Sequence, residues 1–456
     1  MPIPLRTLLG GVIAVAGGAA PRMAPAQDAP VAFVGATIIP IDGDPIDDGV
    51  LIVRDGRIDA VSARADASIP ANATTIDVAG KVIMPGLVDT HSHIGGIGGA
   101  DGSGPIQPGV RVFDSINVHD SGFRRALAGG LTTLNIMPGS GHLSSGQTVY
   151  VKLRFGEPSP DGIADIAYAN ADGSPMGGLK MANGTNSIRE DSASGFPGTR
   201  GKSAFLVREA FIRAQEYKAR IEAAGDDPTK LPPRDLNLET LVEVLDGKRV
   251  VHHHTHRHDD VLTVLRLSKE FGFKVVLHHV SEAWMVAEEI AEADVPCSII
   301  LIDSPGGKLE AENLVFKTGA VLEKAGARFA YHTDDWITDS RLFLRMAALG
   351  VRAGLSREAA LRSLTIAGAE MLDLEDRVGS LTPGKDADFI VLSGDPFSVY
   401  TRIEQTWVEG AKVFDLTDPQ DALYAEGGFG AVHDSVPYFC CYNHLLNADA
   451  AHGEAH

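Results

Sequence analysis

Residues 82–93 read VIMPGLVDTHSH, an apolar run that ends in two histidines separated by one residue. Within it, residues 86–93 are predicted to form a buried strand that ends in these two histidines. Side chains alternate along a strand, so His91 and His93 share one face and lie about 6.5–7 Å apart along it. That spacing allows two imidazoles to bind the same metal, whereas a polar strand end without a metal is the alternative.

The sequence downstream alternates between strand-like and helix-like patterns. Apolar runs at residues 249–254, 274–279, 297–302 and 328–334 are separated by amphipathic stretches of helical period. This alternation predicts a parallel sheet covered on both faces. Residues 86–372 are long enough for an α/β fold of the distorted (β/α)8 TIM barrel type. A doubly wound open sheet is the rival fold, but no Gly-rich phosphate-binding turn follows an early strand.

Both ends of the chain have a different sequence pattern, in which short runs of β-branched residues are separated by Gly-rich turns. We therefore predict one small β-sandwich-like domain, built from residues 27–85 and 373–416 and flanking the barrel. Residues 417–456 would form a C-terminal extension. Its adjacent Cys440 and Cys441 allow either a vicinal disulfide or two free thiols, and three cysteines in all cannot make a disulfide framework.

Residues 1–26 have the pattern of a signal peptide. Arg6 precedes the apolar run 8–20, and the small residues at 24–26 predict cleavage near Ala26, with export to the periplasm or the medium. A buried N-terminal helix is the alternative. The processed chain offers no integral membrane segment. The full 456-residue chain has 40 basic and 60 acidic residues and a net charge of −20, which argues against nucleic acid or an anionic membrane as a partner.

Further metal-binding residue types stand at the ends of later predicted strands: His254, His279 and Asp334. The carboxyl ends of barrel strands meet at one mouth, so these side chains are expected to converge there. Imidazole and carboxylate ligands with open positions suit Zn²⁺ acting on water. Asp334 would then carry the proton to a leaving nitrogen. A helix cap is the alternative role for Asp334.

Not every histidine in the crowded segment is expected to bind a metal. We predict that His252, His253 and His258 lie in a solvated polar loop. Strand alternation further predicts that one of His278 and His279 points outward.

In combination, these motifs resemble the amidohydrolase superfamily, in its imidazolonepropionase- and dipeptidase-like branch. The resemblance is carried by VIMPGLVDTHSH, the histidine-ended strands, HTD at 332–334 and VGSLTPGKDADFIVLSGDP at 378–396. It covers roughly residues 31–415. It implies that His91 and His93 bind the more buried metal, that His254 and His279 bind the more exposed one, and that Asp334 is both a ligand and the general acid/base.

The resemblance also implies a lysine carboxylated on its amine, which bridges two metals. Lys180 in GGLKMANG is the candidate, with a surface lysine as the alternative. The expected cofactor is then a divalent metal, Zn²⁺ in the first instance, with two ions per chain about 3.5–4 Å apart.

Four residues are expected near the substrate. His256 and Arg257 would lie at the pocket rim, in an "HxHR" form of the family's fifth strand. Deaminases of the superfamily typically carry Glu where Arg257 stands, and an arginine there suits a substrate carboxylate. His142 and Gln147, in PGSGHLSSGQ at 138–147, resemble a substrate-facing loop, although His142 could equally be a loop hydrogen-bonding residue.

These features predict an exported, metal-dependent amidohydrolase. It would cleave a C–N bond of a dipeptide, an acyl-amino acid or a cyclic amide by a metal-activated hydroxide, with Asp334 as the proton carrier. A mononuclear deaminase and a lactonase or esterase on the same scaffold are the alternatives, and a non-catalytic metal-binding barrel is a more distant one. Assembly into a homo-oligomer is compatible with the sequence.

Overall fold

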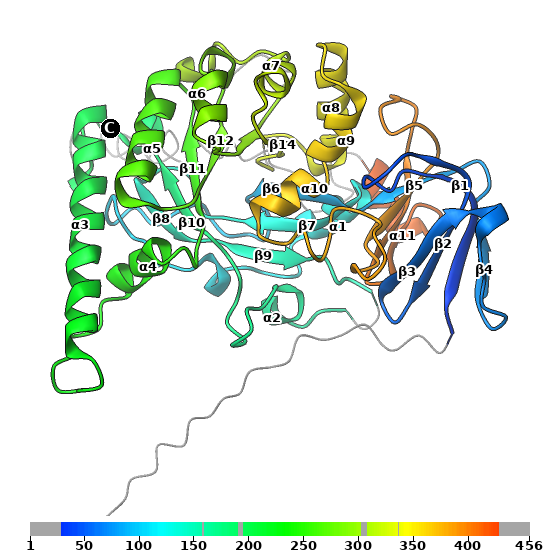
Figure 1. Cartoon of the computed structure of the whole chain (residues 1–456), viewed down its shortest axis with the longest axis horizontal. Coiled ribbons are helices and arrows are strands. Elements are labelled where there is room, and N and C mark those ends of the chain that lie inside the picture. The colour runs from blue at the N-terminus through cyan, green and yellow to red at the C-terminus, as the bar shows by residue number, and fades with distance from the viewer. Residues whose placement is uncertain (1–28, 157–158, 190–194, 302–307, 336, 428–456) are drawn as a thin grey trace, which may run out of the picture.

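The computed structural model describes residues 29–156, 159–189, 195–301, 308–335 and 337–427 of the 456-residue chain. The predicted signal peptide and Cys440–Cys441 lie outside these residues, as does all of the predicted C-terminal extension beyond residue 427. Strands and helices alternate through the middle of the chain, and strands dominate both ends (Figure 1). The predicted α/β class is confirmed.

Within the described residues, both ends of the chain contribute to one eight-stranded sheet, at the right of Figure 1. Its order is β17-β16-β15-β5-β1-β2-β3, and β4 also pairs with β1. In this sheet the ring of Phe33 in β1 lies 4.9 Å from that of Phe389 in β15 and 5.0 Å from that of Trp407 in β16. The two ends of the chain therefore share one aromatic core. The strands are β1 (Val31–Ile38), β2 (Ile46–Arg54), β3 (Arg57–Ala63), β4 (Thr74–Asp77), β5 (Val82–Pro85), β15 (Phe389–Leu392), β16 (Ile403–Val408) and β17 (Ala411–Asp415).

The remaining strands in the described residues form two further sheets, ordered β6-β7-β9 and β14-β13-β12-β11-β10-β8. Two connections join them into a ring. Only Thr148 separates β8 from β9, and a bridge between Ser92 and Asp335 links the ends of β6 and β14. The strands are β6 (Leu87–Ser92), β7 (Leu131–Ile136), β8 (Ser144–Gln147), β9 (Val149–Lys152), β10 (Leu179–Ala182), β11 (Val251–Thr255), β12 (Val275–His279), β13 (Cys297–Ile299) and β14 (Phe329–Tyr331).

One position of this ring departs from a regular strand–helix repeat. Strands β8 and β9 run antiparallel to their neighbours β10 and β7, whereas β10 to β14 are parallel to one another. The cause is the short connection between Ile136 and Ser144, since a parallel crossover needs a dozen or more residues. The chain can therefore only turn back on itself there.

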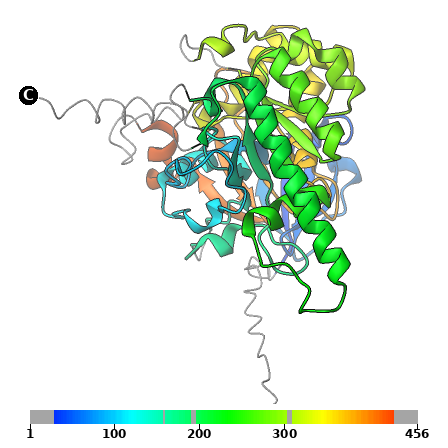
Figure 2. The same cartoon turned by 90° about the vertical axis from the view of Figure 1, so that its left-hand side faces the viewer.

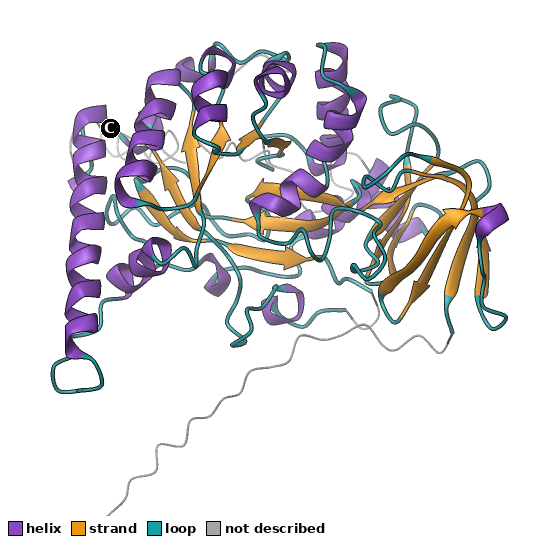
Figure 3. Ribbon diagram, in the orientation of Figure 1, coloured by secondary structure: helices purple, strands orange, loops and turns teal. Residues whose placement is uncertain are grey.

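Helices cover the outside of the parallel strands (Figure 3). The long helix α3 runs along one side of the molecule, which faces the viewer in Figure 2. Among the described residues, none of the helices is both long and apolar enough to cross a membrane. They are α1 (Ser121–Ala128), α2 (Ile163–Ile166), α3 (Arg200–Ala224), α4 (Leu236–Leu245), α5 (His258–Phe271), α6 (Ala287–Glu292), α7 (Thr318–Ala325), α8 (Phe343–Arg352), α9 (Arg357–Ser363), α10 (Ile366–Met371) and α11 (Pro419–Glu426).

A buried charge cluster ties the ring of strands to the eight-stranded sheet. Lys152 of β9 is fully buried, and its Nζ lies 2.5 Å from Asp386, 2.9 Å from Asp388 and 3.4 Å from Glu409. Arg377 also contacts Asp386, at 2.7 Å. The cluster joins β9 to the segments that lead into β15 and β17, so it holds together two parts of the fold that are far apart in sequence.

We expect Lys152→Met to destabilise the protein by about 3–5 kcal/mol at pH 7.5, because it leaves buried carboxylates without their cation. Burial opposes ionisation of Asp386, but Lys152 outweighs this and lowers its pKa below the usual value, and the pKa of Glu409 is lowered as well. Stability that depends on a lowered carboxyl pKa is present above the unfolded-state pKa and is lost as the pH falls through the folded-state pKa.

Urea unfolding at pH 7.5 and near pH 4 measures this effect. The difference in free energy of unfolding between wild type and Lys152→Met should shrink at the lower pH, as the carboxyl groups take up protons. Lys218→Met, which removes a surface lysine paired with Asp246, is the control and should leave the urea midpoint nearly unchanged. Equal midpoint shifts in the two variants would contradict a dominant role of the buried cluster.

Candidate metal centre

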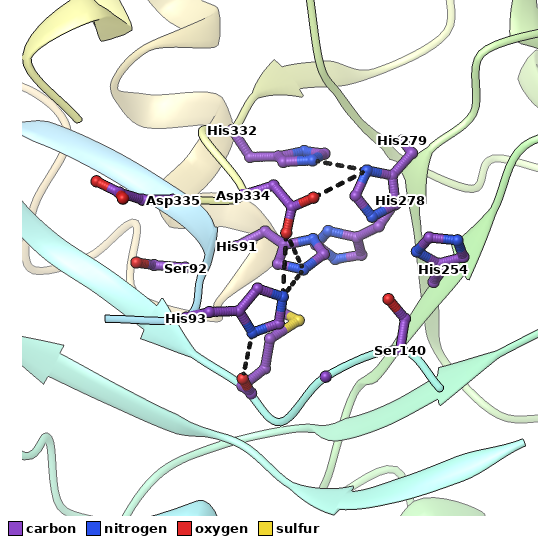
Figure 4. Close-up of polar contacts among 12 residues, drawn as sticks. His91, Ser92, His93, Ser140, His254, His278, His279, His332, Asp334 and Asp335 are labelled. Carbon is purple, nitrogen blue, oxygen red and sulfur yellow. Dashed lines mark hydrogen bonds and ion pairs between the residues drawn. The ribbon is translucent and has the colours of Figure 1, made fainter. Parts of the chain in front are cut away.

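Four predicted site residues converge at the ring mouth formed by the carboxyl ends of β6, β10 and β14. Three of them, His91, His93 and Asp334, are labelled in Figure 4. The Nε2 atoms of His91 and His93 are 3.2 Å apart. Asp334 Oδ1 lies 3.3 Å from His91 Nε2 and 3.0 Å from His93 Nε2. Lys180 Nζ lies 3.0 Å from His91 Nε2. Residues that follow β6 and β14, together with Lys180 of β10, thus point to a single region.

The backbone holds these groups together. Asp334 N donates to His91 O at 2.9 Å, and His93 N donates to Asp335 O at 3.0 Å, so the ends of β6 and β14 are joined. Asp335 bonds Ser340 through its own side chain, with the Ser340 backbone N at 3.0 Å from Oδ2. The helix-capping alternative considered for Asp334 is therefore wrong, because Asp335 bonds Ser340 and Asp334 faces the histidines.

His279 and His254 lie beside this group. The ring of His279, the last residue of β12, is centred 4.8 Å from that of His91 and 4.3 Å from that of His254. Its Nδ1 is 3.9 Å from Asp334 Oδ2. All six residues predicted as metal ligands are thus gathered at the same mouth.

The expectation that one of His278 and His279 points outward is wrong. Both are buried, and the ring of His278 lies 4.9 Å from that of His91. His279 has a left-handed backbone, with φ of 69°. A residue in this conformation breaks the alternation of a strand. Two successive side chains can therefore face the interior.

Burial keeps these imidazoles uncharged. It lowers the pKa of His91, His254 and His279 well below the usual value, with neighbouring histidines adding to the effect. Neutral imidazole is the form that binds metals. His93 donates Nδ1–H to the carbonyl of Met137 at 2.7 Å, which leaves a lone pair at Nε2 when the ring is uncharged.

The residues fit a divalent metal. His93 Nε2 lies 3.0 Å from an oxygen of Asp334, so an imidazole nitrogen and a carboxylate oxygen face each other as two ligands of one metal would. Tetrahedral bonds of metal-ligand length place neighbouring ligand atoms about 3.3 Å apart, close to the separations observed here. In addition, His279 Nε2 and His254 Nδ1 are buried without a hydrogen-bond partner among the described residues. The arrangement therefore has the donor atoms of a metal centre.

Lys180 lies in the interior. It is fully buried in β10, and its Nζ is 3.0 Å from Met137 Sδ as well as from His91 Nε2. The surface-lysine alternative is therefore wrong. An ammonium in such surroundings loses its hydration, which favours the uncharged amine.

The residues predicted to contact substrate behave differently from one another. His256 joins the centre, with its ring 4.7 Å from that of His254 and its Nδ1 2.8 Å from Ser281 Oγ. Arg257 does not. Its guanidinium binds Asp259 through two bonds of 3.0 and 2.9 Å, and it lies half exposed at the start of α5.

The other two residues predicted to contact substrate pack against other parts of the fold. Gln147 donates its side-chain amide to Thr240 Oγ1 of α4, at 2.9 Å, so we correct its predicted substrate role. The reason is that β8 runs antiparallel and presents Gln147 to a covering helix. His142 is buried beside Phe196, with ring centres 5.2 Å apart. In the same loop, Ser140 faces the mouth near His254 (Figure 4).

The polar-loop prediction for His252 and His253 is wrong, because β11 extends through both and buries them. His252 Nδ1 lies 2.9 Å from His278 Nε2, and its Nε2 lies 2.9 Å from the hydroxyl of Tyr150. His258, by contrast, is about half exposed at the start of α5 and pairs with Glu282.

Sequence reasoning also missed His332, which is buried with its Nε2 3.3 Å from His279 Nδ1 and its Nδ1 2.7 Å from Ser298 Oγ. A usable signal was present, since His332 stands two residues before Asp334 and strand period places the two on one face. His91, His278 and His332 are close enough to hold a metal, as are His91, His279 and Asp334.

Comparison with known proteins gives consistent matches. The sequence profile of the amidohydrolase family matches residues 177–414. The amidohydrolase tasK of Hapsidospora irregularis is 30% identical over 80% of this chain, which spans 40% of the length of tasK. A 5-methylthioadenosine/S-adenosylhomocysteine deaminase of Symbiobacterium thermophilum and an imidazolonepropionase of Rhizobium rhizogenes are each 24% identical, over 79% and 76% of this chain and 84% and 86% of their own.

Among solved structures, an amidohydrolase from Thermotoga maritima MSB8 is 33% identical to this chain. The two superpose with a TM-score of 0.78 over 84% of this chain and 100% of the other. The similarity therefore extends over most of this chain and the whole of the other.

Proposed function

The chain belongs to the amidohydrolase family, and from this premise we propose that it hydrolyses a C–N bond of a small substrate at a two-metal centre. The favoured substrates are dipeptides, acyl-amino acids and cyclic amides. The ring of strands is interpreted as the distorted (β/α)8 barrel of this family. The observation that carries the proposal is the convergence of Asp334 with His91 and His93.

His91, His93 and Asp334 would hold one metal, and His254 and His279 the second. The bound metals supply Lewis acidity, which polarises the scissile carbonyl and lowers the pKa of water. Imidazole and carboxylate ligands suit Zn²⁺ among several divalent metals.

Lys180 would bridge the two metals as a carbamate. The ammonium would first lose one proton; the resulting amine attacks CO₂, forms an N–C bond and releases a second proton, so that a buried cation becomes an anion. The burial of Nζ beside His91 supports this step, since it favours the uncharged amine that must react.

Asp334 would move the proton during hydrolysis. Its Oδ1 faces His91 and His93, while Oδ2 lies on the side of His279. From this position the carboxylate accepts the proton of the attacking water and passes it to the leaving nitrogen, which departs as an amine. The buried surroundings exclude competing water and strengthen the electrostatic interactions.

The deaminase alternative is weakened at one position. Deamination in this superfamily typically uses an acidic residue where Arg257 stands, and Arg257 is bound to Asp259 outside the centre. No observation favours lactone or ester hydrolysis over amide hydrolysis, so these reactions are outcomes of the test. Export through the N-terminal segment and assembly into a homo-oligomer stay part of the proposal.

Metal removal tests this function directly. We expect protein purified without added metal to contain about two divalent ions per chain. A chelator should abolish amine release from N-acyl-amino acids, dipeptides or cyclic amides, and Zn²⁺ should restore it. The measurement combines elemental analysis with amine and ammonia assays on the same sample.

The other outcomes each exclude part of the proposal. Ammonia release from amine-bearing heterocycles would show a deaminase, and turnover of lactones alone would show an esterase. Full metal content without turnover of any of these compounds would leave a non-catalytic barrel.

A further inference from the structure

The centre lacks the cation that was expected to recognise a substrate carboxylate, because Arg257 is turned toward Asp259. Another cation stands at the same mouth. Lys308 follows β13, and its Nζ lies 3.4 Å from His254 Nε2. Strands β11 and β13 are both part of the parallel series, so the segments after them open at the same end of the ring.

The segment that carries Lys308 is anchored by Glu310, two residues further on. One oxygen of Glu310, Oε2, accepts from the backbone N of Thr185 at 3.0 Å and from Arg200 Nη2 at 3.2 Å. Gly184 makes this approach possible. It has φ of 68°, and a Cβ there would lie 2.7 Å from Glu310 Oε2. The position of Lys308 is thus set by contacts to the segment after β10.

The electrostatic surroundings of Lys308 call for an anion. Among the ion pairs recorded for the described residues, none involves Lys308, whereas Arg200 and Arg257 are both paired. Toward the centre the ammonium contacts the His254 imidazole, and His254, His256 and Glu310 place ligand atoms within 4.8 Å of one another. Burial lowers the pKa of both His254 and His256, and the charge of Lys308 adds to this effect. Metals bound at the centre would add further positive charge.

A second hydrogen-bonding atom is available next to it. His256 Nε2 is buried and has no hydrogen-bond partner among the described residues. Its Nδ1 contacts Ser281 Oγ at 2.8 Å. When the serine hydroxyl donates to Nδ1, the neutral ring carries its proton on Nε2 and can donate to a ligand oxygen.

We infer that Lys308, assisted by His256, binds the carboxylate of an anionic substrate. The inference rests on the proposed function and narrows its substrate class to dipeptides and acyl-amino acids with a free carboxylate, ahead of neutral cyclic amides. Lys308 thus determines substrate specificity by binding the substrate carboxylate, the role that was predicted for Arg257.

The test compares two variants on a matched pair of substrates. Lys308→Met removes the charge and keeps an unbranched side chain, and Arg257→Met is the matched control. The substrates are N-acetyl-amino acids or glycyl dipeptides and their C-terminal carboxamides. For the carboxylates, Lys308→Met should raise KM about 10- to 150-fold, the range of a charged hydrogen bond, with little change in kcat. Lys308→Arg should recover part of this loss.

For the carboxamides, neither variant should change KM, and Arg257→Met should behave as wild type on both substrates. Equal losses on carboxylate and carboxamide, or a carboxylate-specific loss in Arg257→Met, would overturn the inference. If no amide is cleaved at all, the proposed function fails while this inference can still be measured. Calorimetric titration of metal-loaded wild type with the carboxylate and the carboxamide should then show tighter binding of the carboxylate. Equal binding of the two compounds by wild type would overturn the inference. Tighter binding of the carboxylate that persists in Lys308→Met would overturn it as well.

Discussion

Asp334→Asn is expected to lower kcat/KM by about 10²- to 10⁴-fold, the usual contribution of a general acid/base. The amide that replaces the carboxylate has nearly the same shape but cannot accept the proton of the attacking water. The structure places the Asp334 carboxylate 3.0 Å from His93 and 3.3 Å from His91, so the same substitution would also remove a proposed metal ligand. Steady-state kinetics on the preferred substrate measures the loss.

The adjacent Asp335 provides the matched control. It is buried as well, but it bonds Ser340 and lies 3.6 Å from Arg125 rather than facing the histidines. Asp335→Asn should therefore retain most of the kcat and show its effect in thermal stability. If Asp334→Asn retains wild-type turnover, or if both variants lose activity to the same degree, Asp334 is not the proton carrier.

Lys180→Met is expected to reduce the metal content from about two ions per chain to about one or fewer. Loss of the bridge should lower kcat by roughly 10³-fold, which corresponds to several kcal/mol of transition-state stabilisation. Methionine keeps the apolar volume of a fully buried position in β10 and lies close to Met137. Elemental analysis and circular dichroism on the same preparation separate metal loss from unfolding.

A spectroscopic readout tests the bridge without relying on activity. Wild type loaded with metal in ¹³C-bicarbonate should show a carbamate carbon signal that Lys180→Met lacks. His258→Asn is the control for metal content, since His258 is half exposed and pairs with Glu282 away from the centre. Two ions per chain in Lys180→Met, or the absence of a carbamate signal in wild type, would contradict the assignment of the bridge.

Local periodicity was enough to identify part of the centre. His91 and His93 were placed on one face by the two-residue period of a strand, and the structure brings their Nε2 atoms within 3.2 Å. The bridging role considered for Lys180 came from a family resemblance. Burial, which the structure provides, then excluded a surface lysine.

Periodicity failed where the backbone departs from a regular strand. His278 and His279 both face the interior because His279 has a left-handed φ. His252 and His253 were predicted to lie in a polar loop, because a run of polar histidines is more typical of a solvated segment than of a buried strand. Tertiary packing instead buries them in β11, where His252 bonds both His278 and Tyr150.

Covalent spacing and the period of each element were enough to predict the α/β class and the gathering of His91, His93, His254, His279 and Asp334 at one mouth. Which long side chains reach the centre depended on tertiary packing. Arg257 binds a carboxylate two residues away and Gln147 binds a helix, whereas Lys308 meets His254 from a segment 54 residues further along the chain. A long flexible side chain takes its direction from the partners that packing brings to it, and those partners come from remote parts of the chain.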